Sequence, residues 1–120
     1  MKNKIIVIGK RGLLGKNLGL YLKKKNFVLN LDYKIFIKKK LNFINNFDYI
    51  INCASNKNYT ERKYLKKNDF DFAIASKIKN LNIKMIMLSS RKVYESGANL
   101  KESSLLNPKN NYSKNKLRTE

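Results

Sequence analysis

The chain has 120 residues and a formal net charge of +19, from 27 Lys and Arg residues against 8 Asp and Glu residues. This length suits one domain with a modest core, and a single cysteine, Cys53, excludes an intramolecular disulfide. No apolar stretch approaches the roughly 20 residues of a membrane span, and the absence of histidine excludes serine–histidine chemistry and histidine metal sites.

The positive charge first suggests a protein that binds nucleic acid or another polyanion. However, 23 of the basic residues are lysines, and they are scattered along the chain rather than gathered in one block. Arginine is the usual reader of bases and phosphates, because its planar group forms paired hydrogen bonds. We therefore expect no specific nucleic-acid partner, and a polyanion binder stays an alternative.

The first predicted strand, residues 4–8, is short, apolar and β-branched, and it leads into Gly9, Gly12 and Gly15. A strand, a glycine turn and a helix start are the parts that hold the pyrophosphate of a dinucleotide. The first glycine allows the tight turn, the second lets the backbone approach the phosphates, and the third lets the helix pack close to the strand. The alternative is an ordinary strand–helix turn that binds nothing.

The remaining predicted elements alternate between helices and strands. In chain order they are a helix over about 13–25, a strand over 27–31, an ambiguous segment over 34–47, a strand over 49–54, a long helix over about 60–80, a strand over 83–88, a loop over 91–110 and a helix from about Asn111 to the end. This alternation predicts an α/β fold, a Rossmann-type doubly wound parallel sheet with about four strands.

Two helices are each expected to pack one apolar face on this sheet. The face of the first helix consists of leucines at every fourth position, Leu14, Leu18 and Leu22. The face of the long helix consists of Tyr64, Phe72, Ala75 and Ile78, with the polar Asn68 in line with them. A polar residue at that place is usually a satisfied buried amide, and the alternative is that it holds a water molecule near a catalytic lysine.

Candidate ligand-binding residues lie at the carboxyl ends of the predicted strands, where ligands of such sheets bind. They are Gly9, Asp32, Cys53 with Ala54, and Ser90. A carboxylate at Asp32 accepts hydrogen bonds from the ribose hydroxyls of adenosine and repels a 2′-phosphate, which favours NAD over NADP. Lys10, Arg11 and Lys34 are expected to lie nearby and to soften that preference. The alternatives are a turn-forming role for Asp32 and strand-end capping by Ser90.

The spacing Y-x-x-x-K occurs three times, at Tyr21, Tyr59 and Tyr112, and by itself carries no information in so lysine-rich a chain. The third pair, Tyr112 and Lys116, differs in context, because it follows a strand-end serine and a loop and opens a helix. A lysine ammonium beside a phenol lowers the tyrosine pKa toward a range useful for proton transfer. Ser90 is then placed to hydrogen-bond the reacting oxygen of a substrate.

Five segments in order, GKRGLLG, NLD, DYIINCAS, LSSRKVYESG and KESSLLNPKNNYSKNKLRTE, resemble the extended short-chain dehydrogenase/reductase family. Within it, the chain resembles the NAD-dependent epimerase/dehydratase group that acts on nucleotide sugars, and the IINCAS segment is also similar to dTDP-4-dehydrorhamnose reductases. The resemblance covers the whole chain. It implies a cytoplasmic oxidoreductase that uses NAD, with NADP the less favoured cofactor and a nucleotide sugar as substrate.

The resemblance also implies roles for individual residues. The residues implied in cofactor binding are Gly9, Gly12, Leu13, Leu14, Gly15, Asp32, Cys53, Ala54 and Lys116. The residues implied in catalysis are Ser90, Tyr112, Lys116 and Asn68. No metal site is implied.

The chain departs from the family in three respects. Residues 35–46 are short and lysine-rich and lack the acidic residue that helps to seat the adenine. Arg91 and Lys92 stand where small residues are common. Family chains are more than twice as long, so residues 1–120 are expected to be an NAD(P)-binding domain incomplete at its C-terminal end. Such a fragment alone is expected to be inactive, with a homodimer as one option for the full-length form.

Overall fold

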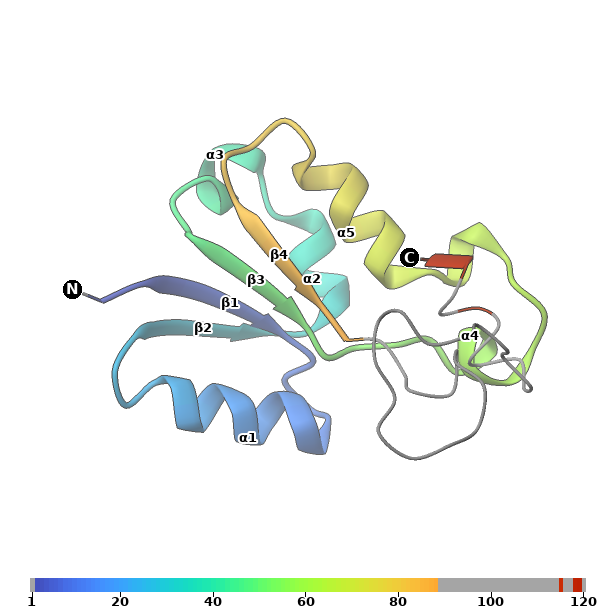
Figure 1. Ribbon diagram of the computed structural model, residues 1–120, viewed down its shortest axis with the longest axis horizontal. Helices are drawn as coiled ribbons and strands as arrows, with labels where there is room; N and C mark the ends of the chain where they lie inside the picture. Colours follow the sequence, from blue (N-terminus) through green and yellow to red (C-terminus); the bar gives the residue numbers. More distant parts are fainter. Residues whose placement is uncertain (1, 89–114, 116–117, 120) are drawn as a thin grey trace, which may run out of the picture. The chain divides into compact units, whose positions relative to one another are not determined.

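A computed structural model describes residues 2–88, 115, 118 and 119 (Figure 1). These residues divide into two compact units. Residues 2–54 and 70–88 form one unit, which we call the sheet unit; residues 55–69 and the described residues after 114 form the second unit.

The sheet unit contains four parallel strands in the order β2-β1-β3-β4 (Figure 1). Their bounds are Lys4–Ile8 for β1, Phe27–Leu31 for β2, Tyr49–Asn52 for β3 and Lys84–Met87 for β4. Ile8 pairs with Leu31 of β2 and with Asn52 of β3, so the carboxyl ends of these strands lie side by side. The strand order reverses between β1 and β3, the place where such sheets bind ligands. The predicted Rossmann-type sheet is confirmed.

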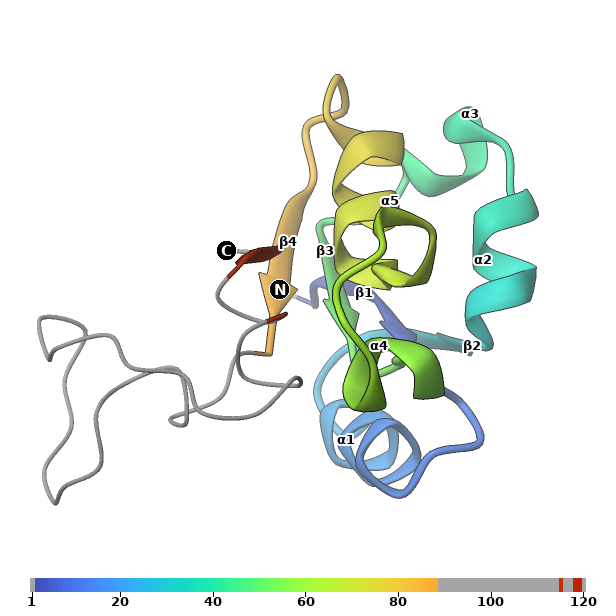
Figure 2. The same cartoon turned by 90° about the vertical axis from the view of Figure 1, so that its right-hand side faces the viewer.

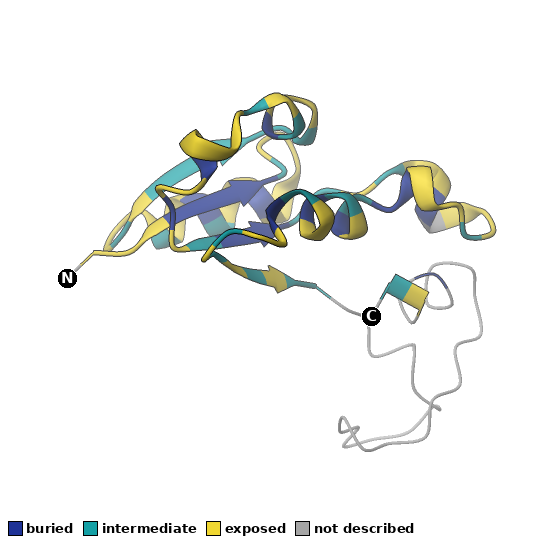
Figure 3. Cartoon of the chain, turned by 90° about the horizontal axis from the view of Figure 1, so that it is seen from above, coloured by how far each residue is buried: buried dark blue, intermediate teal, exposed yellow. Residues whose placement is uncertain are grey.

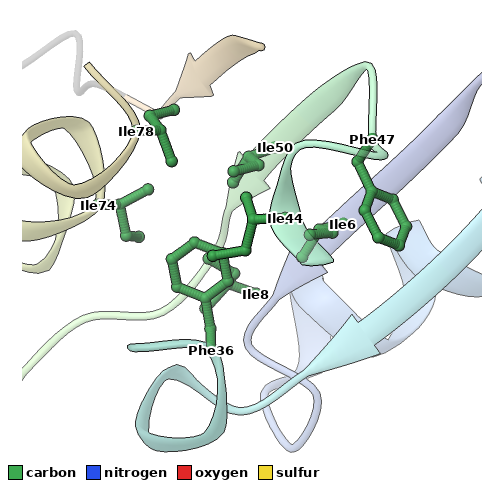
Figure 4. Close-up of a cluster of buried hydrophobic side chains, with 8 residues drawn as sticks. All are labelled: Ile6, Ile8, Phe36, Ile44, Phe47, Ile50, Ile74 and Ile78. Carbon is green, nitrogen blue, oxygen red and sulfur yellow. The ribbon is translucent and has the colours of Figure 1, made fainter. Parts of the chain in front are cut away.

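One face of the sheet carries the larger core (Figure 4). Three helices cover it: α2 (Tyr33–Lys38), α3 (Leu41–Ile44) and α5 (Phe70–Ile78). Because successive strand residues point to opposite faces, alternate residues of β1 and β3 enter this core. Its buried members are Ile6, Ile8, Phe36, Ile44, Phe47, Ile50, Ile74 and Ile78. The segment 34–47, ambiguous in the sequence, therefore forms two short helices that bury Phe36 and Ile44.

The opposite face is covered by α1 (Leu13–Leu22), which Figure 2 shows across the sheet from α2, α3 and α5. Leu18 and Leu22 pack against the buried residues of β1 and β3 on this side. The prediction was wrong for Leu14, which is 55% exposed, because the glycines of α1 rather than Leu14 lie closest to the sheet. In Figure 3 the two central strands, β1 and β3, are largely dark blue because most of their residues are buried, whereas many helix residues are yellow.

Several predicted bounds change by a few residues. The first helix ends at Leu22 rather than near 25, and the strands predicted over 49–54 and 83–88 end at Asn52 and Met87. The lysines at 23–25 do not extend the helix, because three consecutive side chains there face solvent and bury no apolar surface. No helix in the described part of the chain is long and apolar enough to span a membrane.

The long helix predicted over about 60–80 was wrong. The chain instead forms α4 (Lys57–Glu61), a 3₁₀ turn η1 (Lys66–Asn68) and α5, with extended backbone at Arg62. The predicted apolar face is confirmed at Ile78, which is buried, but it was wrong for Phe72 and Ala75, which are exposed. Asp71 and Ile74 are buried in their place. At residues 62–69, hydrogen bonds to distant residues replace the hydrogen bonds of a helix. These tertiary bonds outweigh the weak helix propensity of this polar segment.

Asn30 joins α1 to β2 in a contact that depends on Gly19. The Asn30 Nδ2 atom donates to the Gly15 carbonyl at 3.2 Å. A β-carbon on Gly19 would lie 2.6 Å from that nitrogen. Gly19 is therefore a packing glycine, distinct from the three of the turn.

We expect Gly19→Ala to lower the free energy of unfolding by about 1 kcal/mol, because the added methyl group displaces the Asn30 side chain and breaks its hydrogen bond to the Gly15 carbonyl. In an Asn30→Ala background the same substitution should cost little, because the clashing group is gone. Urea unfolding of the two single variants and the double variant measures this coupling. An equal cost of Gly19→Ala in both backgrounds would contradict this account of the contact.

Candidate functional site

The turn after β1 requires glycine at its first position. Gly9 has φ +113°, a backbone conformation that residues with a β-carbon rarely adopt. A β-carbon there would also lie 3.1 Å from the Cys53 carbonyl carbon and 3.2 Å from the Ala54 nitrogen. The Gly9 amide donates to the Leu31 carbonyl at 2.8 Å, which ties the turn to β2. The predicted turn thus lies against the ends of both neighbouring strands.

The third glycine brings the start of α1 onto this turn. A β-carbon on Gly15 would overlap the Gly9 carbonyl oxygen and lie 2.8 Å from the carbonyl carbon. Gly12 is different: its nearest neighbour would be the Gly9 oxygen at 3.7 Å, an ordinary contact. Gly9 and Gly15 are thus required by packing, whereas packing leaves Gly12 open to substitution.

The first turn of α1 presents backbone donors that no described residue accepts. The Lys16 amide donates to the Gly12 carbonyl at 3.0 Å, but the amides of Leu13, Leu14 and Gly15 have no acceptor among the described residues. The side chains of Leu13 and Leu14 are 80% and 55% exposed. Free N–H groups and the positive end of the helix dipole favour an anion here. This arrangement fits a diphosphate.

Asp32 lies at the carboxyl end of β2, where it is the N-cap residue of α2. Its carbonyl accepts the amides of Ile35 and Phe36 at 3.1 and 3.0 Å, whereas its carboxylate makes no capping hydrogen bond. The Arg11 Nε atom lies 3.3 Å from both carboxylate oxygens. The Arg11 side chain is 82% exposed, so this pair is weak and solvated. The backbone of Asp32 makes the turn, and its carboxylate stays available to a ligand.

The end of β3 is held by a buried pair that the sequence analysis missed. Asn52 accepts the Ala54 amide at 3.0 Å and donates to the Ala54 carbonyl at 3.1 Å. It also donates to the Asp71 carboxylate at 2.7 Å, and both residues are buried. This clamp positions Cys53 and Ala54 beside Gly9. The signal in the sequence was an amide at the end of an otherwise apolar strand.

Cys53 has a raised pKa, because burial of the thiol and the negative charge of Asp71 both disfavour the thiolate. We therefore expect iodoacetamide to alkylate the native protein more slowly than free cysteine at pH 8. Asp71→Asn should speed the reaction by removing the negative charge, while Asp48→Asn, at the other end of β3, should not. The measurement is the rate of mass gain, and equal rates in both variants would contradict the assignment to Asp71.

The second unit holds Asn68 and a buried carboxylate. Asn68 is buried in η1, and its amide donates to the Leu65 carbonyl at 2.9 Å. The adjacent Asp69 is 1% exposed and accepts hydrogen bonds from Tyr64 at 2.8 Å and Thr119 at 2.7 Å. Burial and the hydrogen bond to Asp69 raise the pKa of Tyr64, so its phenol remains a donor. Asn68 is buried as expected, but it lies in the short helix η1 rather than in a long α-helix.

Tyr59, one of the three Y-x-x-x-K tyrosines, has a structural role in the second unit. It is 3% exposed, and its hydroxyl lies 2.7 Å from the Thr119 hydroxyl. Asn115 donates to the carbonyls of Tyr59 and Arg62 at 2.6 and 2.8 Å. These bonds hold the helical residues 115, 118 and 119 against the segment 59–69. Tyr21, in contrast, is 68% exposed on α1.

The structure thus brings together one group of predicted residues and leaves the others untested. The group around the glycine turn is Gly9, Gly12, Leu13, Leu14, Gly15, Asp32, Cys53 and Ala54. Ser90, Tyr112 and Lys116 lie outside the described residues. Among the described residues, no group of three or more acidic or cysteine side chains is placed to hold a metal ion.

No protein-family model and no curated protein matches the sequence. Among solved structures, the chain is similar to a UDP-N-acetylglucosamine 4-epimerase from Methanobrevibacter ruminantium, with a TM-score of 0.78 and 24% identity over 100% of this chain and 49% of that one. A dTDP-4-dehydrorhamnose reductase from Clostridium acetobutylicum gives a TM-score of 0.72 and 23% identity over 97% of this chain and 47% of that one.

A third similar structure, a dTDP-glucose 4,6-dehydratase from Bacillus anthracis in complex with NAD, gives a TM-score of 0.74 and 18% identity over 98% of this chain and 48% of that one. The chain therefore spans about half the length of each of these three structures. At such identities the likeness establishes the fold, and function has to be argued from the residues.

Proposed function

We propose that the chain belongs to the extended short-chain dehydrogenase/reductase family and is an NAD-binding domain of an enzyme that modifies a nucleotide sugar. The epimerase/dehydratase type is favoured, and residues 1–120 supply the cofactor-binding domain. The observation that carries the proposal is the glycine turn, where Gly15 contacts Gly9 and the first-turn amides of α1 have no acceptor in the described part of the chain. The fold shared with three nucleotide-sugar enzymes supports it.

In this proposal residues at the carboxyl ends of β1, β2 and β3 would hold NAD. The amides of Leu13, Leu14 and Gly15 bind the pyrophosphate, and Gly12 leaves room for it. Asp32 accepts the ribose hydroxyls, while Cys53 and Ala54 border the cofactor next to Gly9. NAD would serve as the hydride carrier for the reaction at the sugar.

The proposed catalytic roles fall on residues named from the sequence. Tyr112 moves the proton of a sugar hydroxyl, and Lys116 favours the charged form of that phenol. Lys116 also binds the cofactor ribose side, and Ser90 hydrogen-bonds the reacting oxygen. Asn68 positions a water molecule, a role that its buried place in η1 permits. A cytoplasmic location and a homodimeric full-length form belong to the same proposal.

Two other functions stay open, each with its own support. The likeness to a dTDP-4-dehydrorhamnose reductase supports a reductase acting on a sugar nucleotide. The glycine turn and Asp32 are binding features, and they support equally a dinucleotide-binding module without catalysis. Turnover of UDP- and dTDP-sugars by the full-length protein separates them: an enzyme interconverts a sugar, a reductase consumes NADH, and a module does neither.

We expect NAD(H) to bind at least about fivefold more tightly than NADP(H), because Asp32 repels a 2′-phosphate. Asp32→Asn should remove this preference, since Arg11 loses its partner and becomes free to bind the phosphate. Arg11→Ala should instead widen the preference for NAD(H). Calorimetric titration of each cofactor measures the ratio of the two affinities. A second readout is whether bound NAD protects Cys53 from alkylation by iodoacetamide. A clear preference of the wild type for NADPH would contradict the role of Asp32.

A further inference from the structure

A basic groove of about 600 Å³ lies between α1 and β2 in the sheet unit. Four exposed cations line it, Lys10, Arg11, Lys16 and Lys23. The rest of its lining comes from α1 and from residues 28–30 of β2. The groove therefore combines positive charge with the backbone of a strand.

That strand is at the edge of the sheet. Within the described residues, β2 pairs with β1 alone (Figure 1). The Phe27 amide donates to Asn3 at 3.0 Å and the Leu31 carbonyl accepts Gly9 at 2.8 Å, so alternate residues from Phe27 direct their backbone groups toward β1. By this alternation the N–H and C=O groups of Val28 and Asn30 point to the outer edge. Both residues line the groove.

The charges of the groove are largely unneutralised. Arg11 pairs with Asp32, whereas Lys10, Lys16 and Lys23 form no ion pair with any described residue. None of the described residues that line the groove is acidic. A ligand with several negative charges therefore gains attraction without having to displace a carboxylate of this chain.

We propose that this groove binds an extended acidic segment of a partner polypeptide, which adds a strand to the outer edge of β2. The backbone of the segment pairs with Val28 and Asn30, and its carboxylates lie against Lys16 and Lys23. Strand addition of this kind takes its affinity from backbone hydrogen bonds and its selectivity from side chains. The inference is independent of the proposed function, because it uses neither the free amides of α1 nor Asp32.

Two other occupants fit the groove less well. A second copy of this chain carries the same net charge of +19, so electrostatic repulsion opposes it. The phosphates of a nucleic acid would neutralise the lysine charges. However, its backbone does not offer hydrogen-bond donors that alternate with acceptors at the spacing of a strand. The two free amides and two free carbonyls at Val28 and Asn30 favour a polypeptide.

The test uses a fluorescent peptide of about ten residues in which Glu and Thr alternate. This peptide is long enough to pair along the whole of β2. Fluorescence anisotropy should show binding to the wild-type chain, and Lys16→Gln with Lys23→Gln should weaken it by about tenfold. Lys38→Gln with Lys79→Gln removes the same charge from exposed positions on the opposite side of the sheet. It should change the affinity by less than about twofold.

Residue-resolved amide exchange separates strand addition from simple charge attraction. The bound peptide should slow exchange of the Val28 and Asn30 amides, while that of Leu29, already directed toward β1, should change little. A Gln-Thr peptide and an N-methylated Glu-Thr peptide should both bind weakly. Equal binding of the N-methylated peptide, unchanged exchange at Val28 and Asn30, or tighter binding of a thymidine oligonucleotide of equal charge would overturn the proposal.

Discussion

Gly15→Ala is expected to lower the affinity for NAD by about 100-fold or more, which corresponds to about 2.7 kcal/mol. The added β-carbon would overlap the Gly9 carbonyl, so α1 must move away from β1. That movement takes the amides of Leu13 and Leu14 out of position for the pyrophosphate. Overpacking should also lower the free energy of unfolding by about 1–3 kcal/mol. Calorimetric titration and urea unfolding measure the two effects.

Gly12→Ala is the matched control, because it makes the same change three residues earlier. Its β-carbon would meet nothing closer than 3.7 Å, and Gly12 has an ordinary φ of −79°. Stability should therefore stay within about 0.5 kcal/mol of the wild type. NAD affinity should still fall, since the methyl group occupies the space where the phosphates approach. A Gly15→Ala variant with wild-type affinity would contradict the proposed pyrophosphate site.

Tyr112→Phe is expected to lower turnover of the full-length protein by at least about 100-fold, the usual scale for a general acid or base. The substitution keeps the ring and removes only the phenol oxygen that moves the proton. Affinity for NAD should change little, because the phenol contributes little to dinucleotide binding. The measurement is conversion of a UDP- or dTDP-sugar, with the NAD titration run beside it.

The other two Y-x-x-x-K tyrosines serve as controls with the same local spacing. Tyr21→Phe changes an exposed residue on α1 and should alter neither stability nor turnover. Tyr59→Phe removes the hydrogen bond to Thr119, so it should lower the free energy of unfolding by about 1 kcal/mol without a loss in turnover per folded molecule. Near-normal turnover in Tyr112→Phe together with a loss in either control would overturn the catalytic assignment.

The elements predicted most accurately are the ones whose signals are local. The bounds of β1 and β2 agree with the structure, because each is a short apolar run between polar or glycine residues. The long helix failed for the opposite reason. Residues 62–69 have no glycine or proline to end a helix, and the break depends on distant partners such as Asn115, which binds the Arg62 carbonyl.

The sequence by itself determined the parallel sheet, the glycine turn and the carboxylate at the end of β2, because strand and turn preferences act over a few neighbouring residues. Only the tertiary structure decided that Asn52 is clamped by Asp71 and that Arg11 reaches Asp32. These two contacts join residues that are 19 and 21 positions apart. Such contacts form when crossover connections bring strand ends together, and no local pattern encodes them.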